Sequence, residues 1–279
     1  MNVAVRKAAT EADTGALKKR AAQLRGKIIE MSHAAQAAHL ASSLSCADVL
    51  TAAYWHVLNI NPERPDDPLR DRFILSKGHA ACALYVSLWS RGLLSDDDLK
   101  LFHKDNTRLP GHPPANAFSA IPFATGSLGH GLSLAAGTAL ARRLKENDDH
   151  IFCMTSDGEW QEGSTWEAMI FLCHHNLTNL TILIDRNNLQ GFGTTNDVAS
   201  MAPLEKRLGG FDIEIHRVRG HDLDMIRQAL SAPASRPKVI VLDTTKGHGV
   251  SFMENRMEWH YLPLNEGQYR QAIDEVDAR

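Results

Sequence analysis

The 279-residue sequence has no apolar run long enough to span a bilayer, and its N-terminus lacks the hydrophobic stretch of a secretory signal peptide. It also has little net charge, because 30 basic residues against 33 acidic ones give −3. This near-balance argues against a general binder of nucleic acids or other polyanions. With 43% hydrophobic and 23% charged residues, the composition excludes disordered and fibrous proteins and indicates a soluble globular protein.

Cysteine is also scarce. The sequence contains no CxxC pair and no zinc-ligand spacing, and its cysteines are far apart in apolar surroundings. We therefore expect free, buried thiols in a reducing cytoplasm. They are Cys46, Cys82, Cys153 and Cys173.

Short apolar runs alternate with longer helical patterns along the chain. The runs predict strands at 72–76, 150–156, 180–186, 211–218 and 238–245. The helical patterns cover 13–35, 45–58, 77–92, 95–102, 128–147, 160–175 and 222–231, with Ser45 and Ser95 as N-caps of the second and fourth. This alternation predicts an α/β fold, a doubly wound and mostly parallel sheet flanked by helices.

No repeat or linker divides the chain, so we expect one domain over residues 1–279. Its ends are expected to be a flexible segment at about 1–12 and a helix at about 265–279. Residues 104–127 are rich in proline and glycine and lack a regular pattern, and so long a loop in a compact domain is usually functional.

Polar residues follow two of the predicted strands. Asp157, Gly158 and Glu159 come after the strand at 150–156, and Asn187 to Leu189 come after the strand at 180–186. The two groups are one strand–helix–strand unit apart, so both can lie at adjacent strand ends. A carboxylate, an amide oxygen and a backbone carbonyl suit Mg²⁺ or Ca²⁺ when a phosphate supplies further ligands. Each group alone is typical of a turn, but together they favour a metal–diphosphate site.

This spacing resembles the thiamine diphosphate motif of transketolases, GDG followed by NN, with Ser156 in place of the first glycine. Other segments resemble the same family, including FILSKGHA, LPGHP, TGSLGHG, DGEWQEGSTWEA and KGHGVSFMENRMEWH, and the likeness covers about residues 15–265. It implies the N-terminal, diphosphate-binding half of a transketolase. Such an enzyme uses thiamine diphosphate with Mg²⁺ (or Ca²⁺ or Mn²⁺) to move a two-carbon ketol unit from a ketose phosphate to an aldose phosphate.

The resemblance also implies roles for individual residues. The catalytic candidates are His39, His79, His112 and His260. The cofactor-binding candidates are His79, Gly126, Ser127, Leu128, Asp157, Gly158, Glu159, Asn187, Lys246 and His260, and the metal ligands are Asp157, Asn187 and Leu189. Glu162 and Glu167 resemble acids at the family's dimer interface, although a solvated acidic helix face explains Glu167 equally well. His221 is interpreted as structural, and His248 is assigned no role.

A full-length transketolase is more than twice as long as this chain. The additional length of the family's full-length members comprises the pyrimidine-binding and C-terminal domains. The resemblance therefore implies a heterotetramer in which two copies of this chain assemble with two copies of a separate C-terminal subunit. Three alternatives stay open: a 1-deoxyxylulose-phosphate synthase-like subunit, a 2-oxo acid dehydrogenase E1 α-like subunit, and a non-catalytic partner-binding paralogue. The candidate histidines favour a sugar over a 2-oxo acid.

The sequence departs from the family near the expected sugar entrance. The glycines beside His39 are replaced by alanine and serine, and Tyr261 stands where glycine is usual. A pentose phosphate, a branched sugar phosphate and a sulfonated sugar therefore all stay candidates for the donor.

Overall fold

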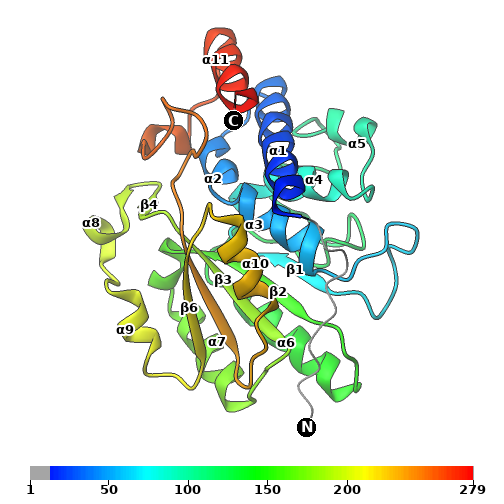
Figure 1. Cartoon of the computed structure of the whole chain (residues 1–279), viewed down its shortest axis with the longest axis vertical. Helices are drawn as coiled ribbons and strands as arrows, with labels where there is room; N and C mark the ends of the chain where they lie inside the picture. The colour runs from blue at the N-terminus through cyan, green and yellow to red at the C-terminus, as the bar shows by residue number, and fades with distance from the viewer. Residues whose placement is uncertain (1–12, 279) are drawn as a thin grey trace.

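A five-stranded sheet forms the centre of the molecule in the computed structural model, which describes residues 13–278 (Figure 1). The predicted flexible segment at 1–12 lies outside these residues. The strand order is β1-β2-β3-β7-β6 and every pair is parallel, which confirms the predicted α/β class. The strands are β1 (Arg72–Leu75), β2 (Ile151–Ser156), β3 (Leu180–Arg186), β6 (Glu214–Arg219) and β7 (Lys238–Asp243).

Each face of the sheet contributes side chains to its own hydrophobic core. In β1, Phe73 and Leu75 join one core while Ile74 joins the other, and the same alternation continues in the neighbouring strands. Successive side chains of a strand point to opposite faces, so a strand covered on both sides must be apolar throughout. This requirement explains the continuous apolar runs that made the central strands visible in the sequence.

Helices cover both faces. On the face of Phe73, the core includes residues of α1 (Thr14–Ala34), α2 (Leu40–Ser45), α3 (Ala47–Ala52), α4 (Ala81–Ser90), α5 (Asp96–Lys100) and α10 (Leu223–Ser231). On the face of Ile74 it includes residues of α6 (Gly131–Leu144), α7 (Gly163–His174) and α9 (Leu204–Leu208). The predicted C-terminal helix is confirmed as α11 (Glu266–Asp277), which packs against α1 (Figure 1).

One of the two predicted N-caps is confirmed and the other is wrong. Ser95 forms a complete capping box with Asp98 at the start of α5. Ser45 instead ends α2, because the helix predicted from residue 45 begins at Leu40 and is interrupted at Cys46. The Ser45 hydroxyl donates to the carboxylate of Asp185 at 2.7 Å, so a buried polar contact takes the place of the cap.

Other predicted boundaries also shift. The helix predicted from 128 begins at Gly131, with His130 in the N-cap position. A 3-10 turn over Gly158–Gln161 precedes α7. The segment after β3, for which the sequence predicts no helix or strand, contains β4 (Leu189–Gln190), β5 (Gly193–Thr194) and α8 (Thr195–Ala199).

The cysteines of the chain are free, and Cys173 is partly exposed whereas the other three are buried. Across residues 13–278, none of the helices combines the length and the apolar character that crossing a membrane requires.

Candidate active site

A cavity of about 250 Å³ opens where β2 and β3 end at the carboxyl edge of the sheet. Segments far apart in the sequence meet there, as expected for ligand sites of open α/β sheets. The predicted residues that line the cavity are His39, His79, His112, Gly126, Leu128, Asp157, Gly158, Asn187, Leu189 and His260. Ser42, Ser156, Gln190, Gly191, Phe192 and Tyr261 line it as well.

Asp157 and Asn187 lie at adjacent strand ends, as the sequence indicated. Ser156, the last residue of β2, pairs with Asp185 of β3, and Asp157 and Asn187 each follow within two residues. The Asp157 carboxylate accepts the backbone N–H groups of Gly158 at 2.8 Å and Asn188 at 2.5 Å. These bonds tie the end of β2 to the turn after β3, so the oxygen donors of both strand ends face one cavity.

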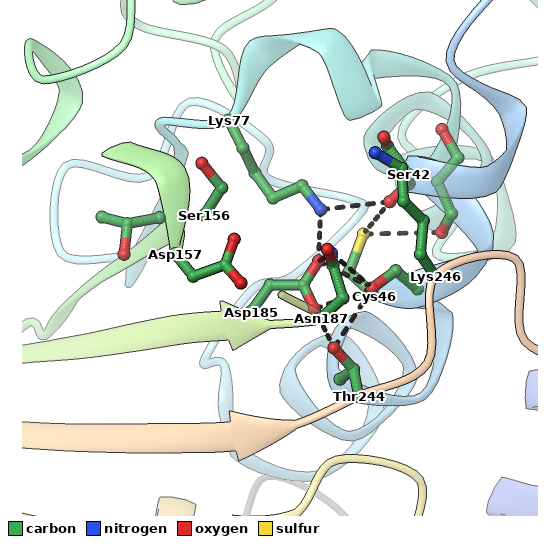
Figure 2. A network of polar contacts seen from close by, with 12 residues as sticks. Ser42, Cys46, Lys77, Ser156, Asp157, Asp185, Asn187, Thr244 and Lys246 are labelled. Carbon is green, nitrogen blue, oxygen red and sulfur yellow. Dashed lines mark hydrogen bonds and ion pairs between the residues drawn. The ribbon is translucent and has the colours of Figure 1, made fainter. Parts of the chain in front are cut away.

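Beneath Asp157 lies a buried polar network that was not anticipated from the sequence. The carboxylate of Asp185 is paired with the ammonium group of Lys77, and both side chains are fully buried. It also accepts the hydroxyls of Ser45 and Thr244, while Lys77 donates to the Ser42 carbonyl at 3.1 Å (Figure 2). A charged residue ending an apolar strand, as in FILSK and ILID, was the available signal for this network.

The two neighbouring carboxyl groups have opposite pKa shifts. Burial and the nearby charge of Asp185 raise the pKa of Asp157 to about 7. Burial opposes ionisation of Asp185 too, but Lys77 and the hydroxyl donors hold its pKa below the ordinary value. Among the residues that the structure describes, no basic side chain forms an ion pair with Asp157, and Asp157 lines the cavity. A bound cation would supply that missing charge.

Four histidines gather on one side of the cavity. The ring of His39 lies 4.7 Å from that of His260, 5.6 Å from His79 and 5.8 Å from His112. His39 has a left-handed backbone (φ 67°), and its N–H donates to the His260 carbonyl at 3.1 Å. Left-handed conformations are uncommon outside glycine and cluster at functional sites.

All four imidazoles are held neutral. Burial lowers the pKa of His39 to about 4 and that of His260 to about 3, with neighbouring histidine and lysine side chains adding to both shifts. Burial also lowers the pKa of His79 and His112. A neutral imidazole has one donor and one acceptor nitrogen, so this cluster can bind hydroxyl groups and transfer protons.

Lys246 contacts one of these histidines but does not line the cavity. Its ammonium group is 3.0 Å from Nδ1 of His260 and 3.4 Å from the Leu189 carbonyl. Burial and the charge of Lys77 lower the pKa of Lys246 to about 8. Because an ammonium group has only donors, Nδ1 of His260 accepts, and the ring proton of His260 resides on Nε2.

The loop before α6 forms another wall. At Gly126 (φ +135°) a Cβ atom would lie 2.5 Å from the His112 ring, so only glycine fits there. Glu159 does not line the cavity: its buried carboxylate accepts the N–H of Gly129 at 2.9 Å and the Ser76 hydroxyl, and thus supports this loop from beneath. Ser127 is exposed and also lies outside the lining.

The cavity mouth is aromatic. Tyr261 is 50% exposed, and its hydroxyl donates to the Gly191 carbonyl at 2.9 Å. This bond attaches the β4–β5 hairpin to the segment after His260, and Phe192 at the hairpin tip is 86% exposed. The bulky residue in place of the family's glycine therefore forms part of the entrance.

Glu162 and Glu167 are exposed near the start of α7. The same helix exposes Ile170 (63%) and Phe171 (39%). Glu167 shares a face of α7 with Ile170 and Phe171, three and four residues further on, whereas Glu162 occupies the N-cap position of the helix. Neither acid lines the cavity.

Comparisons with known proteins match nearly all of the described chain. The family model "Transketolase, thiamine diphosphate binding domain" matches residues 17–276. The chain is 36% identical over 263 residues to one subunit of the apulose-4-phosphate transketolase of Actinobacillus succinogenes, covering 93% of this chain and 95% of the relative. It is 35% identical over 242 residues to a 6-deoxy-6-sulfo-D-fructose transketolase subunit of Clostridium sp., covering 86% and 88%.

The fold also matches solved structures. Transketolase from Campylobacter jejuni superposes with a TM-score of 0.88 at 30% identity over 95% of this chain. The present chain spans 43% of the length of that protein.

The neutral histidines predict a specific pH dependence of stability. In the unfolded state a histidine has a pKa of about 6.5, whereas in the folded state the pKa is about 4 for His39 and about 3 for His260. The unfolded state therefore binds more protons between these values, and stability should fall as pH falls from 6.5 to 4. Urea unfolding of the chain across this range measures the effect.

Replacing both groups, His39→Gln with His260→Gln, should flatten that pH dependence. The matched control is His174→Gln, because His174 is exposed on α7. An unchanged slope in the double variant would contradict the neutral state of these two imidazoles.

Proposed function

The chain belongs to the transketolase family, and from this premise we propose that it is one subunit of a two-subunit enzyme that moves a two-carbon ketol unit from a ketose to an aldose. The observation that carries the proposal is the convergence of Asp157, Asn187 and the four histidines on one cavity at the carboxyl edge of the sheet. A site for a metal and a diphosphate thus adjoins a site for sugar hydroxyls.

The oxygen donors of the cavity fit a divalent cation. Asp157, Asn187 and the Leu189 carbonyl would hold Mg²⁺ (or Ca²⁺ or Mn²⁺) beside the diphosphate, and the high pKa of Asp157 supports this assignment because a cation would keep its carboxylate ionised. The backbone can approach the cofactor closely at three lining residues, Gly126, Leu128 and Gly158. When bound, thiamine diphosphate supplies a nucleophilic ring carbon that allows the ketose C2–C3 bond to break.

The histidines bind and orient the sugar. His260 receives a hydrogen bond at Nδ1 from Lys246, so its Nε2–H is the group that donates to a substrate hydroxyl. His39 is fixed to the same segment through its backbone, and His112 and His79 complete the neutral cluster. Neutral imidazoles near hydroxyls can both position them and transfer their protons near pH 7.

A second polypeptide completes the enzyme in this proposal. The chain is one diphosphate-binding domain, and its relatives of similar length are named as subunits. The partner supplies the site for the pyrimidine end of the cofactor, and two of each chain form a heterotetramer in the cytoplasm. The exposed apolar side chains on the helix of Glu167 support a protein contact on α7, because such groupings mark interaction surfaces.

Small residues on the adjoining helix support the same contact. Gly137 of α6 is exposed and has no atom within 4 Å of a built Cβ, and the same is true of Gly163 at the start of α7. Leu144 at the end of α6 is 75% exposed. Together with the exposed side chains of α7 they form a surface on which another chain can pack closely.

Asp157→Ala should remove metal-dependent cofactor binding while the chain still folds. Losing the one carboxylate of the ligand set should weaken affinity by more than about a hundredfold, since even residues behind metal ligands contribute about 10–100-fold. Titration of the assembled enzyme with thiamine diphosphate and Mg²⁺ measures this. Asp105→Ala is the control, because Asp105 is exposed in the loop after α5. Unchanged affinity in the Asp157 variant would refute the assignment.

His112→Ala should lower turnover far more than cofactor affinity. Its imidazole faces the cavity beside Gly126, and loss of a proton-transferring or positioning group typically lowers rate by about a hundredfold or more. Steady-state kinetics of the assembled enzyme give kcat/KM, and a separate titration gives the cofactor affinity. Equal losses in both would place His112 in cofactor binding rather than in the sugar site.

The isolated chain should be inactive and should bind thiamine diphosphate weakly. Adding the product of the neighbouring gene should restore affinity and activity together, because each chain holds one part of the site. The measurement is ketol transfer with and without that product, on a donor panel of pentose phosphates, branched sugar phosphates and sulfonated sugars. Full activity of this chain alone would overturn the two-subunit proposal.

A further inference from the structure

A buried ionic chain lies outside the cavity and runs from α1 to the loop after β7. The guanidinium group of Arg25 is paired with the carboxylate of Asp48, and both side chains are buried. Nδ1 of His221 lies 2.8 Å from the same carboxylate, and Nε2 of His221 lies 2.8 Å from the backbone nitrogen of Thr245.

The direction of each bond in this chain is fixed. A backbone N–H can only donate, so Nε2 of His221 accepts from Thr245. The ring proton therefore resides on Nδ1 and is donated to Asp48. Burial opposes the charge of Asp48, but Arg25 and His221 hold its pKa well below the usual range, so the acceptor stays ionised. The His248 ring stacks on His221 at 3.6 Å and fixes its plane.

Asp48, His221 and His248 could also converge on a metal ion, since their ligand atoms lie within 4.8 Å of one another. Two observations argue against that use. Arg25 already neutralises Asp48, and both ring nitrogens of His221 are engaged. A hydrogen-bonded clamp on the loop explains the geometry without an ion.

The clamped residue lies between two residues whose side chains contact groups of the active site. Thr244, just before Thr245, donates its hydroxyl to Asp185, and Lys246, just after it, contacts Nδ1 of His260. The next residue, Gly247, donates its N–H to the Ala41 carbonyl at 2.9 Å. The loop is thus held on its inner side by site residues and on its outer side by His221.

We propose that Asp48 and His221 are positioning residues that hold the loop at Thr245 and thereby keep Lys246 against His260. Neither residue touches the cavity. Their effect on catalysis rests on the proposed function, whereas their effect on the ring of His260 does not. With Lys246 in place, His260 has a single tautomer whose Nε2–H is available to a substrate; with Lys246 displaced, both tautomers become populated.

Two substitutions of His221, similar in size, distinguish a role in holding the loop by hydrogen bonds from a role in packing alone. In His221→Asn the side-chain amide can still reach Asp48 from the position of Nδ1 but cannot reach Thr245. In His221→Gln the longer side chain places its carbonyl oxygen near the position of Nε2, where it can accept from Thr245. Lys246→Met removes the group that acts on His260 and shows the fully released state.

Nitrogen NMR of the imidazole groups in the full chain at pH 7 reads the tautomer of His260 directly. We expect one tautomer, with the proton on Nε2, in the wild type and in His221→Gln. We expect a mixture in His221→Asn and in Lys246→Met, and no further change when the last two are combined. A single tautomer in a folded His221→Asn variant, with only a lower thermal midpoint, would show a purely structural role and overturn the proposal.

Kinetics of the assembled enzyme provide the second readout. His221→Asn should lower kcat by about tenfold, since small misplacements of site groups by distant mutations can cost up to about a hundredfold. The affinity for thiamine diphosphate should change much less, and His221→Gln should restore kcat. Loss of kcat that His221→Gln does not restore would count against the clamp. If no donor is turned over even by the wild type, the proposed function fails while the tautomer test still decides the clamp.

Discussion

The ion pair between Lys77 and Asp185 is the contact on which the rest of the site depends. Its partners come from four separate segments: Lys77 follows β1, Asp185 lies in β3, Thr244 follows β7, and Ser45 ends α2. Breaking a fully buried pair by removing one partner typically costs about 3–5 kcal/mol, because the remaining charge has neither water nor a counter-ion. The pair therefore forces these four segments to meet at one point under the cavity, although it contributes little to stability beyond what well-packed apolar side chains would give.

That pair also contributes to the electrostatics of the cavity. Burial and the ionised Asp185 raise the pKa of Asp157, while burial together with the charge of Lys77 lowers the pKa of Lys246, His79 and His260. The side of the cavity at Asp157 thus has a carboxylate without an ion-pair partner, and the side at the four histidines carries uncharged hydrogen-bonding groups. A cation with a diphosphate suits the first side, and a polyhydroxylated substrate suits the second.

The sequence predicted the parts of this arrangement that local patterns encode. The central strands were recognised because a sheet covered on both faces needs uninterrupted apolar runs, and Asp157 and Asn187 were paired because parallel strands end at one edge. The sequence does not reveal the roles of Lys77 and Asp185, because a charged residue at the end of an apolar run resembles an ordinary strand terminus. The N-cap predicted at Ser45 is wrong for a related reason: a serine before a helical pattern is usually a cap, and only the tertiary structure brings Asp185 to its hydroxyl.

The cavity mouth combines a well-held backbone with an exposed apolar side chain, which is unusual for a surface that faces only water. Phe192 is almost fully exposed at the tip of a two-stranded hairpin, and the Tyr261 hydroxyl holds that tip in place through Gly191. A Cβ at residue 191 would lie 2.4 Å from the same hydroxyl, so a larger residue there would displace the Tyr261 side chain from this contact. A hairpin held this closely while its largest apolar side chain stays in water is expected where a second surface covers the mouth. In the proposed two-subunit enzyme, the same covering would enclose a substrate between this entrance and the four histidines, so that the site would be complete only after assembly.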